Sequence, residues 1–403
     1  MRVAQIKNCN SNNIETSRNV KRITIITKYY SPSTTIDAVS VNRLVYLLRE
    51  QCPNIHVTVI TTSSGYGKGG RYSVVELDKF SGVNVKSINF PWKNLKNDFL
   101  KFVTGLVEGL VIIVRSLRVR SDLIITLSNP PCINLWSALL LKGRNWCYWC
   151  FDLYPDALFA ANCSKNQGFI RRVIERVFYY NSPKLVCALG VNQLDYIRKM
   201  YRSKNLQGII LPCGIHETQS LEDRPLWASN EKIIIGYVGN VGRAHSSEFL
   251  LNVIRSAIQR PDIVMVLSIY GYHSKAILDE VKLMAAINII IIPNVKQSEL
   301  SWIDVHLVSL KPDWTHVSVP SKAVSAVCAG SALWFCGSKQ SDTYTGFACC
   351  SYYSFEDMGA VSILLDTLSR ESVNFKKSEA VKCRDQLLKC EKASVIKIVE
   401  GLG

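Results

Sequence analysis

Several features that would identify common protein classes are missing from this sequence of 403 residues. The first 20 residues contain no apolar stretch of the kind found in secretory signal peptides, so we expect no such signal there. The most apolar run, residues 99–117, is interrupted by Lys101, Glu108 and Arg115. Each charge near a bilayer centre costs about 2.5–3.5 kcal/mol, so we expect a helix that is buried or lies at a membrane surface.

Motifs for nucleic acid and for common nucleotide-binding sites are missing as well. We find no zinc-finger spacing, no aromatic RNA-binding motif and no long basic run, which argues against nucleic acid as a partner. The G-x-x-x-x-G-K-[ST] loop of P-loop enzymes is absent. Acidic residues are few, 32 against 48 lysines and arginines. This net charge of +16 favours polyanionic partners such as phosphorylated substrates or anionic lipid.

Cysteine is plentiful, but its spacing indicates neither a disulfide framework nor a zinc site. Fourteen cysteines are scattered through a chain of medium size, which favours reduced thiols in a cytosol. Cys147 and Cys150 form a C-x-x-C motif, but no second pair stands at zinc-site spacing. The motif lies in an expected strand, whereas a redox motif begins a helix. We therefore predict that both are core cysteines.

Apolar strands alternate with helices in two halves of the chain. A polar tail, residues 1–20, precedes the first half, residues 21–212, which contains RITIIT, HVTVITT, DLIITL and KLVCAL. Residues 213–230 are polar and irregular and are the expected linker. The alternation restarts over 231–385, and a helix is expected to close the chain over 386–403. The pattern predicts an α/β fold of two Rossmann-like, doubly wound domains with a ligand cleft between them.

One helix of the first half, GFIRRVIERVFYY, has apolar residues on one face and arginines on the other. We expect it to cover the sheet with its apolar face. The alternative is that this helix presents its arginines to a membrane.

The strongest local pattern is a glycine turn at the start of the second half. A strand is expected to end at Val238, and Gly239, Asn240 and Gly242 then form a turn before a helix that a serine can cap. Glycines let backbone amides approach a phosphate, and a helix N-terminus adds positive potential. Arg243 adds a charged side chain to this turn. Alternatively, the glycines serve only the backbone conformation of the turn.

A second pattern is Pro-Ser-Lys at residues 320–322, where a short helix is expected to begin. Pro320 suits the first helical turn, Ser321 offers a hydroxyl and Lys322 a point charge, and Gly330 can end the helix. The position between two strands brings Lys322 toward the same strand ends as the glycine turn. A solvated lysine is the alternative.

Two carboxylates stand out in the first half, in the segment CFDLYPDALFAANC. A strand runs into Asp152, and Asp156 begins the next element. A carboxylate directly after a parallel strand faces the ligand crevice of such a fold. Each of them can instead cap a helix. The loop SNPP, residues 128–131, is expected at the same rim.

Together these motifs resemble the bacterial-type glycosyltransferases of family 4, and more narrowly the subgroup that builds exopolysaccharide, capsule or O-antigen chains of lipopolysaccharide. The ordered set is YYSPS, SNPP, DLYPD, GYVGNVG, DVHLVSL and VPSK followed by CAG, and it covers the chain from Lys21 onward. The resemblance implies a GT-B fold. It also implies a retaining, metal-independent hexosyl transfer, without a cofactor, from a UDP- or GDP-linked nucleotide sugar.

The resemblance also implies where the substrates bind. The donor would bind the C-terminal half and the acceptor the N-terminal half. The residues that the resemblance and the patterns assign are Asp152, Lys322 and Arg243 for catalysis, Gly239, Asn240, Gly242, His245, Gly271, Ser321 and Ser325 for the donor, and Ser31, Pro32 and Asp156 for the acceptor. No metal ligand is assigned. A glycan linked to polyprenyl diphosphate is the implied acceptor, which would place a cytoplasmic, peripheral protein at the inner face of the plasma membrane.

Four positions depart from the family pattern. Relatives carry arginine and lysine where this chain has Asn240 and His245, and two glutamates where it has Val317 and Ser325. One glutamate contacts the donor sugar and the other binds the ribose diol. A serine in the second place would weaken donor binding by about 1–3 kcal/mol. We expect Lys322, with the arginine of the glycine turn, to balance the leaving-group charge.

Three functions follow from these patterns. The first is sugar transfer to a glycan acceptor in the synthesis of cell-surface polysaccharide. A nucleotide-sugar 2-epimerase of the same fold is the second, and it would need acidic and histidine groups in the cleft. The third is a binding or scaffold paralogue without catalysis, which the serine at position 325 favours.

Overall fold

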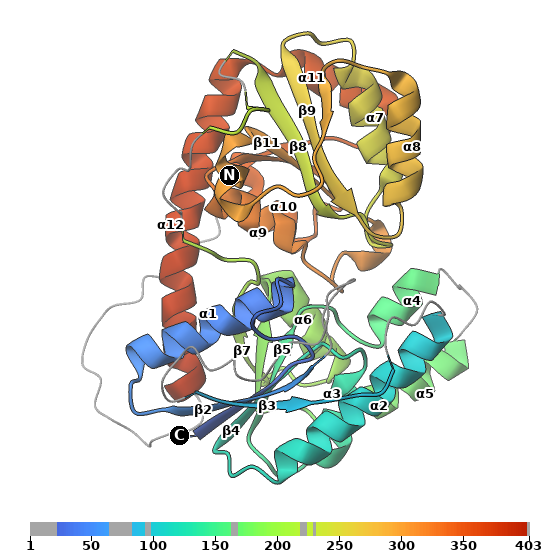
Figure 1. The fold of residues 1–403 in the computed structure, drawn as a ribbon. Helices are drawn as coiled ribbons and strands as arrows, with labels where there is room; N and C mark the ends of the chain where they lie inside the picture. The colour runs from blue at the N-terminus through green and yellow to red at the C-terminus, as the bar shows by residue number, and fades with distance from the viewer. Residues whose placement is uncertain are drawn as a thin grey trace.

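The computed structural model describes residues 22–63, 83–92, 98–162, 168–217, 224–228 and 231–400. They form two α/β domains, one above the other in Figure 1. The predicted polar tail at 1–20 and part of the predicted linker lie outside the described residues, as do residues 401–403.

The N-terminal domain is built on a seven-stranded parallel sheet in the order β3-β2-β1-β4-β5-β6-β7. Its strands are β1 (Arg22–Ile26), β2 (His56–Thr62), β3 (Val83–Ile88), β4 (Leu123–Leu127), β5 (Trp146–Cys150), β6 (Leu185–Ala188) and β7 (Gln207–Ile210). Its helices are α1 (Ile36–Gln51), α2 (Asp98–Leu117), α3 (Ile133–Leu140), α4 (Asp156–Asn162), α5 (Gly168–Phe178) and α6 (Val191–Met200). Every residue of β4 and of β5 is buried, as expected for central strands covered on both faces.

The C-terminal domain repeats this plan with a six-stranded parallel sheet in the order β10-β9-β8-β11-β12-β13. Its strands are β8 (Ile233–Asn240), β9 (Ile263–Tyr270), β10 (Ile289–Ile291), β11 (Val305–Leu310), β12 (Ala332–Gly337) and β13 (Ser351–Tyr353). Its helices are α7 (Ser247–Ala257), α8 (Ser274–Met284), α9 (Ser321–Cys328), α10 (Asp342–Phe347), α11 (Met358–Thr367) and α12 (Arg370–Glu400), with short 3-10 helices η2 (Gln297–Trp302), η3 (Pro312–Trp314) and η4 (Ala348–Cys350). The two predicted Rossmann-like, doubly wound domains are therefore confirmed.

In each sheet the strand order reverses at one place, between β1 and β4 and between β8 and β11. Ligands of doubly wound folds bind beyond the carboxyl ends of the strands at such a reversal. β8 and β11 are paired only at Ile235 with Val305 and Gly236 with His306, although β8 continues to Asn240. The two strands thus separate toward their carboxyl ends, which leaves polar groups of β11 available to the loop after β8.

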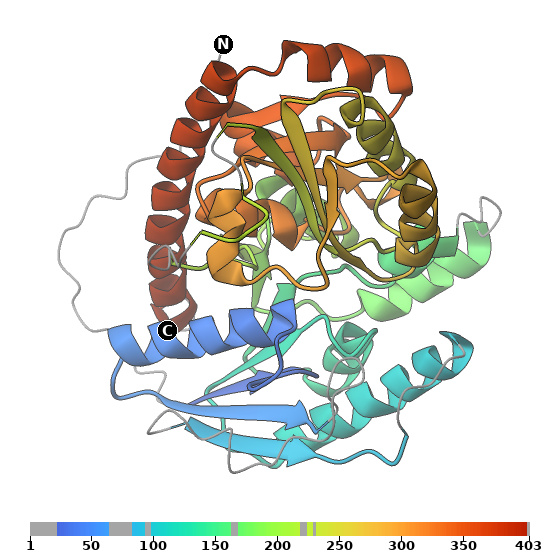
Figure 2. The same cartoon turned by 45° about the horizontal axis from the view of Figure 1, so that its top comes forward.

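Helix α12 joins the two domains. It was predicted over 386–403, but it begins at Arg370 and runs along both domains in Figures 1 and 2. Ala380 packs in the core of the C-terminal domain, whereas Val395 and Ile398 pack in the core of the N-terminal domain. The spacing of apolar residues along the sequence does not reveal the full length of this helix, because its buried residues face first the core of one domain and then the core of the other.

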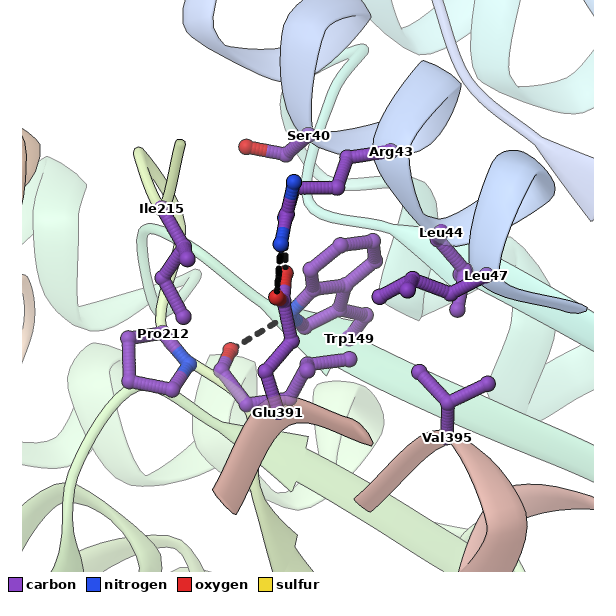
Figure 3. Close-up of a pocket in the computed structure, with 10 residues that line it drawn as sticks. Ser40, Arg43, Leu44, Leu47, Trp149, Pro212, Ile215, Glu391 and Val395 are labelled. Atoms are coloured by element: carbon purple, nitrogen blue, oxygen red, sulfur yellow. Dashed lines mark hydrogen bonds and ion pairs between the residues drawn. The ribbon is translucent and has the colours of Figure 1, made fainter. Parts of the chain in front are cut away.

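A buried ion pair fastens the end of α12 to α1, beside a small pocket shown in Figure 3. The Arg43 side chain donates to Glu391 through Nε, at 2.7 and 2.8 Å from the two carboxylate oxygens. Trp149 lines the same pocket and donates its indole N–H to the carbonyl of Leu211 at 2.9 Å. Because Glu391 is buried, this ion pair is not a solvent-exposed surface pair, and it holds α12 against the N-terminal domain.

Two predictions about single segments are confirmed. Cys147 and Cys150 lie fully buried in β5, and the Cys147 sulfur is 3.5 Å from that of Cys187 in the next strand, with no disulfide. The apolar run at 99–117 forms the single helix α2. Among the described residues, no helix is both long and apolar enough to cross a membrane.

Candidate functional site

The carboxyl edges of the two sheets face each other. Asp152, just after β5, forms an antiparallel bridge with Ser318 before α9, and the amide of Leu153 donates to the carbonyl of Val317 at 2.9 Å. Asp342, at the start of α10, accepts 2.8 Å hydrogen bonds from the backbone amides of Asn192 and Gln193 at the start of α6. The strand ends of the two halves are therefore neighbours, as predicted.

On the C-terminal side the site is built around the turn after β8. β8 continues two residues beyond the predicted end and pairs through Asn240 with Tyr270 of β9. Gly239 and Gly271 both adopt positive φ, at 119° and 102°. A Cβ on Gly271 would fall 1.8 Å from the Asn240 side-chain oxygen, so only glycine permits this approach. The Asn240 side chain thus lies against Gly242 and Gly271 while remaining exposed to solvent.

The chain then enters α7 through a helix cap that joins β11. The Ser246 side chain accepts from the amide of Phe249 at 3.1 Å and donates to the Glu356 carboxylate at 2.6 Å. The amide of Ser246 donates to the Ser309 hydroxyl at 3.0 Å. Gly242 and Arg243 are left on the outer side of this turn, with Arg243 exposed.

Lys322 points from the first turn of α9 to the glycine turn. Its ammonium group donates to the Tyr237 hydroxyl at 2.6 Å and to the Asn240 carbonyl at 2.9 Å, and it lies 4.2 Å from the centre of the Tyr237 ring. Within the described part of the chain, no carboxylate is hydrogen-bonded to this ammonium group or forms an ion pair with it. Burial lowers the pKa of Lys322 to about 7. The ammonium group of Lys322 is therefore positioned to bind an anionic ligand.

His245 is neutral in this arrangement. Burial, with the nearby charge of Lys322, lowers the pKa of His245 to about 3. Its Nδ1 is 2.6 Å from the Ser309 carbonyl, to which it must therefore donate, leaving Nε2 as the acceptor. His245 occupies the place of a basic residue in the family pattern, but it adds no positive charge here.

Further cations surround the same turn. The Arg243 guanidinium stacks over the Tyr272 ring at 5.0 Å. Lys311 follows β11, and its amide donates to the Ala244 carbonyl at 2.8 Å. Burial and the nearby charges of Lys311 and Arg243 lower the pKa of His273. Three permanent or titratable cations therefore converge on one helix N-terminus, an arrangement that suits a diphosphate.

On the N-terminal side, Asp152 lies with a second carboxylate that we did not predict, Asp37 in the first turn of α1. Burial raises the pKa of Asp37 to about 6, and the charge of Asp152 adds to this shift. Asn129, in the predicted SNPP loop, donates to Asp37 at 2.7 Å. Burial also raises the pKa of Asp152, while a hydrogen bond from Ser318 opposes that shift. The two carboxylates are the acidic part of the site.

Asp156 is fully engaged in the N-terminal domain. Its carboxylate accepts hydrogen bonds from the hydroxyls of Tyr179 at 2.6 Å and Tyr196 at 2.7 Å, and Arg171 lies 3.7 Å away. The alternative reading of this residue, as a structural anchor at a helix start, accounts for all these contacts. We therefore leave Asp156 out of the candidate site.

Ser31 and Pro32 lie in the loop between β1 and α1, half-buried, in the same connection that leads to Asp37. Ser321 begins α9 beside the interdomain segment. A Cβ on Gly214 would lie 2.9 Å from the Ser321 carbonyl oxygen and 3.0 Å from the Ser325 hydroxyl.

The two positions where the family 4 pattern has glutamates are both engaged within the protein. Ser325 donates to the Gly214 carbonyl at 3.1 Å. Val317 is buried in the core of the N-terminal domain. Val317 has no group that could bind a sugar hydroxyl, and Ser325 already uses its hydroxyl proton for Gly214.

Sequence reasoning missed Tyr237, Lys311 and Asp37 as members of the site. Tyr237 lies within a strand that looked wholly apolar, and Lys311 follows DVHLVSL directly. Asp37 stands in the first turn after the first strand, a position that signals a ligand crevice as clearly as that of Asp152.

One group of residues could hold a metal ion. Among the described residues, Cys349, Cys350 and Cys383 form a cluster of sulfurs within 4.8 Å of one another. It comes from η4 and α12 and not from the strand ends that form the candidate site.

No protein-family model matches the chain, and no curated protein matches it in sequence. Solved structures do match over nearly their whole length. Sucrose-phosphate synthase from Thermosynechococcus elongatus aligns over 94% of this chain and 98% of its own, with 14% identity and a TM-score of 0.66. WaaG, a glycosyltransferase involved in lipopolysaccharide biosynthesis, aligns over 94% and 100%, with 15% identity and a TM-score of 0.59.

A third match is Anabaena HepE in complex with UDP and glucose, over 94% of this chain and 99% of its own, with 10% identity and a TM-score of 0.62. At these identities the likeness shows the fold alone. It is the GT-B fold, two Rossmann-like domains with facing strand ends, and the fold predicted from the sequence is confirmed.

Proposed function

We propose that this protein is a glycosyltransferase that moves a hexose from a nucleotide sugar to a glycan acceptor, with retention and without a metal ion. The donor diphosphate binds at the turn after β8, against Lys322 and Arg243. The acceptor binds at the carboxyl edge of the N-terminal sheet, beside Asp152 and Asp37. The family 4 resemblance and the GT-B fold support this assignment.

The chemistry of sugar transfer explains this division of charge. As the bond from the sugar to the diphosphate breaks, positive character develops on the sugar carbon and negative charge on the leaving diphosphate. Cations and amides fixed in advance lower the energy of that state most effectively. Lys322 is fixed by the Tyr237 hydroxyl and the Asn240 carbonyl, so it needs no rearrangement to meet the leaving group.

The acidic side suits an acceptor hydroxyl. A carboxylate with a raised pKa can accept a proton at neutral pH more readily than an ordinary one. The pKa of Asp37 is about 6, and that of Asp152 is raised as well. In this proposal Asp152 positions the acceptor hydroxyl, and Asp37 lies next to it.

The single observation that carries the proposal is the position of Lys322. It is partly buried beside the glycine turn, and among the described residues its ammonium group has no carboxylate partner. Calorimetric titration with UDP, GDP, ADP and CMP tests it. We expect one nucleoside diphosphate to bind and Lys322→Met to weaken its binding at least tenfold. Lys275→Met is the matched control, because Lys275 is an exposed lysine of the same domain, paired with Asp279. UDP is our first choice, because HepE was solved with UDP.

A scaffold paralogue is the second candidate, favoured by the engagement of Ser325 with Gly214. The nucleotide titration separates the two. Binding of a nucleoside diphosphate together with release of that diphosphate from its sugar in the presence of a lipid-linked glycan supports transfer. Absence of binding by all four nucleotides would refute the proposed enzyme and leave the scaffold.

Two helices support a membrane-linked acceptor. Helix α2 exposes an apolar stripe at intervals of three and four residues, formed by Leu100, Val103, Val107, Val111 and Val114. Helix α5 exposes Phe169, Ile170, Val173 and Val177, with Phe169 80% exposed. Helix α3 contacts both, and the two helices lie on the same side of the domain in Figures 1 and 2. We predicted from the sequence that the apolar face of α5 covers the sheet. This prediction is wrong for Ile170, Val173 and Val177, which are exposed.

The charge of this surface selects the kind of membrane. Arg172 and Arg176 of α5 stand beside the apolar residues and would meet anionic headgroups. We propose that this face rests on an anionic bilayer, where a polyprenyl-diphosphate-linked acceptor would be found.

Sedimentation with vesicles tests the membrane face separately from the donor site. The chain should pellet with vesicles that contain phosphatidylglycerol and not with pure phosphatidylcholine. Phe169→Asp should abolish pelleting without changing nucleotide binding. Ile363→Asp is the control, because Ile363 is 69% exposed on α11 of the other domain. Equal pelleting of Phe169→Asp and the parent would refute this face.

A further inference from the structure

Three cysteines far apart in the sequence meet where η4 packs on α12. Cys349 and Cys350 are neighbours in η4, and Cys383 comes from the middle of α12. Their sulfurs all lie within 4.8 Å of one another, and those of Cys349 and Cys383 are 3.1 Å apart. Cys350 is fully buried, Cys383 is half-buried and Cys349 is exposed. The cluster therefore opens to solvent on one side only.

These separations match the needs of a thiolate-bound cation. Zinc binds thiolate sulfur at about 2.3 Å in a tetrahedron, which places two ligand sulfurs about 3.8 Å apart. A small rotation of the side chains brings sulfurs within 4.8 Å to that spacing. Thiols are weak hydrogen-bond partners, so three of them gain little from packing together without a cation.

The surroundings suit the charge of such a centre. Three thiolates and one divalent cation leave a net charge of −1. The Lys376 ammonium donates to the Cys349 carbonyl at 2.9 Å, and Lys382 stands directly before Cys383 on α12. These lysines would balance the negative centre and favour the thiolate form.

A fourth ligand position faces the solvent. Glu379 lies four residues before Cys383, on the same face of α12, and accepts from Lys382 at 2.6 Å. Water or this carboxylate could complete a tetrahedron.

We propose that Cys349, Cys350 and Cys383 bind one zinc ion, which fastens α12 to the C-terminal domain. This site lies outside the donor and acceptor residues, so its role is structural. Zinc would join the end of α10 and η4 to the helix that continues into the N-terminal domain. The proposal is independent of the proposed function, because it requires neither nucleotide nor acceptor.

Metal analysis of the purified full chain tests the proposal. The chain is produced with zinc in the medium and freed of loosely bound ions by gel filtration. We expect about one zinc per chain in the parent, and a loss of at least tenfold in Cys349→Ser and in Cys383→Ser. Cys390→Ser is the matched control, because Cys390 lies two helical turns beyond Cys383 on α12 and outside the cluster. It should keep its zinc.

Cobalt substitution gives a second measurement that does not depend on activity. Cobalt bound by thiolates shows a sulfur-to-cobalt charge-transfer band in the near ultraviolet, which should appear in the parent and in Cys390→Ser and be absent in Cys349→Ser. Because Cys349 is exposed, its replacement by serine leaves the core intact, and circular dichroism checks that the variant is folded.

Two outcomes would overturn the proposal. One is a parent chain that binds neither zinc nor cobalt and whose exposed Cys349 reacts with an alkylating reagent as fast in the presence of zinc as in its absence. The other is a disulfide between Cys349 and Cys383, found by peptide mass mapping of the chain purified without reductant. Either outcome leaves the donor-site titration unaffected, so the two hypotheses fail separately.

Discussion

The position of Lys322 predicts an unusual pH dependence of donor binding. In the free protein, burial holds the pKa of Lys322 at about 7 instead of the ordinary 10.5. A bound diphosphate would place two negative phosphates beside the ammonium group and raise its pKa again. The complex therefore takes up a proton above pH 7, and the affinity falls as the pH rises through that value.

The magnitude follows from the two pKa values. If the complex restores the ordinary pKa of 10.5, the protonated fraction of free Lys322 falls about tenfold between pH 6 and pH 8 while the complex stays protonated. The dissociation constant should then rise about tenfold, or about 1.4 kcal/mol of binding free energy. His245, with a pKa of about 3, stays neutral throughout this range.

Calorimetry with a nucleotide sugar measures this effect without interference from the ligand. The diphosphate of a nucleotide sugar is esterified at both ends, so neither phosphate titrates near neutral pH. The terminal phosphate of UDP does titrate there. The Lys322→Met variant should bind more weakly at all pH values and show no such slope. Lys275→Met should keep it. An affinity of the parent that stays constant from pH 6 to pH 8 would refute the reasoning.

Three further predictions concern the rest of the molecule. Asp37→Asn should raise the midpoint of thermal unfolding at pH 7.5 and not at pH 4, because the pKa of Asp37 is raised to about 6 and its buried charge costs stability above that pH, by about 3 kcal/mol at most. The same variant should slow sugar transfer, and a lower midpoint at pH 7.5 would contradict this assignment. Ser325→Glu should not improve nucleotide affinity in calorimetry but should destabilise the fold by about 1–3 kcal/mol in urea denaturation, because a carboxylate would face the Gly214 carbonyl. Glu391→Ala should destabilise it by about 3–5 kcal/mol in the same assay, since Arg43 would remain buried without its main partner, and an unchanged midpoint would show that the pair contributes nothing.

The two domains could be predicted from the sequence because apolar strands of both halves are separated by helices of ordinary length. Lys322 and Gly239 could be assigned to one place for the same reason, since the ends of parallel strands share an edge. Three aspects could not be predicted. The engagement of Asp156 by Tyr179 and Tyr196 depends on residues 23 and 40 positions away, which no local pattern reveals.

The cysteine cluster is the second such case. A search for zinc ligands in a sequence relies on two close pairs, and here the third sulfur comes from a helix 33 residues after Cys350. Likewise, the role of Ser325 depends on a backbone carbonyl of the interdomain segment, and not on the residue type at its own position.

The chain crosses between the domains twice, after β7 and along α12, and the second crossing is a single stiff rod of 31 residues. A rod anchored in both cores resists bending, so any movement of one domain against the other must be a rotation about an axis close to it. Points near that axis, such as Arg43 and Glu391, hardly move in such a rotation. Such a rotation would pull Asp152 away from Ser318 and Asp342 away from the start of α6, so these contacts, and not α12, would set how far apart the donor and acceptor sides are held.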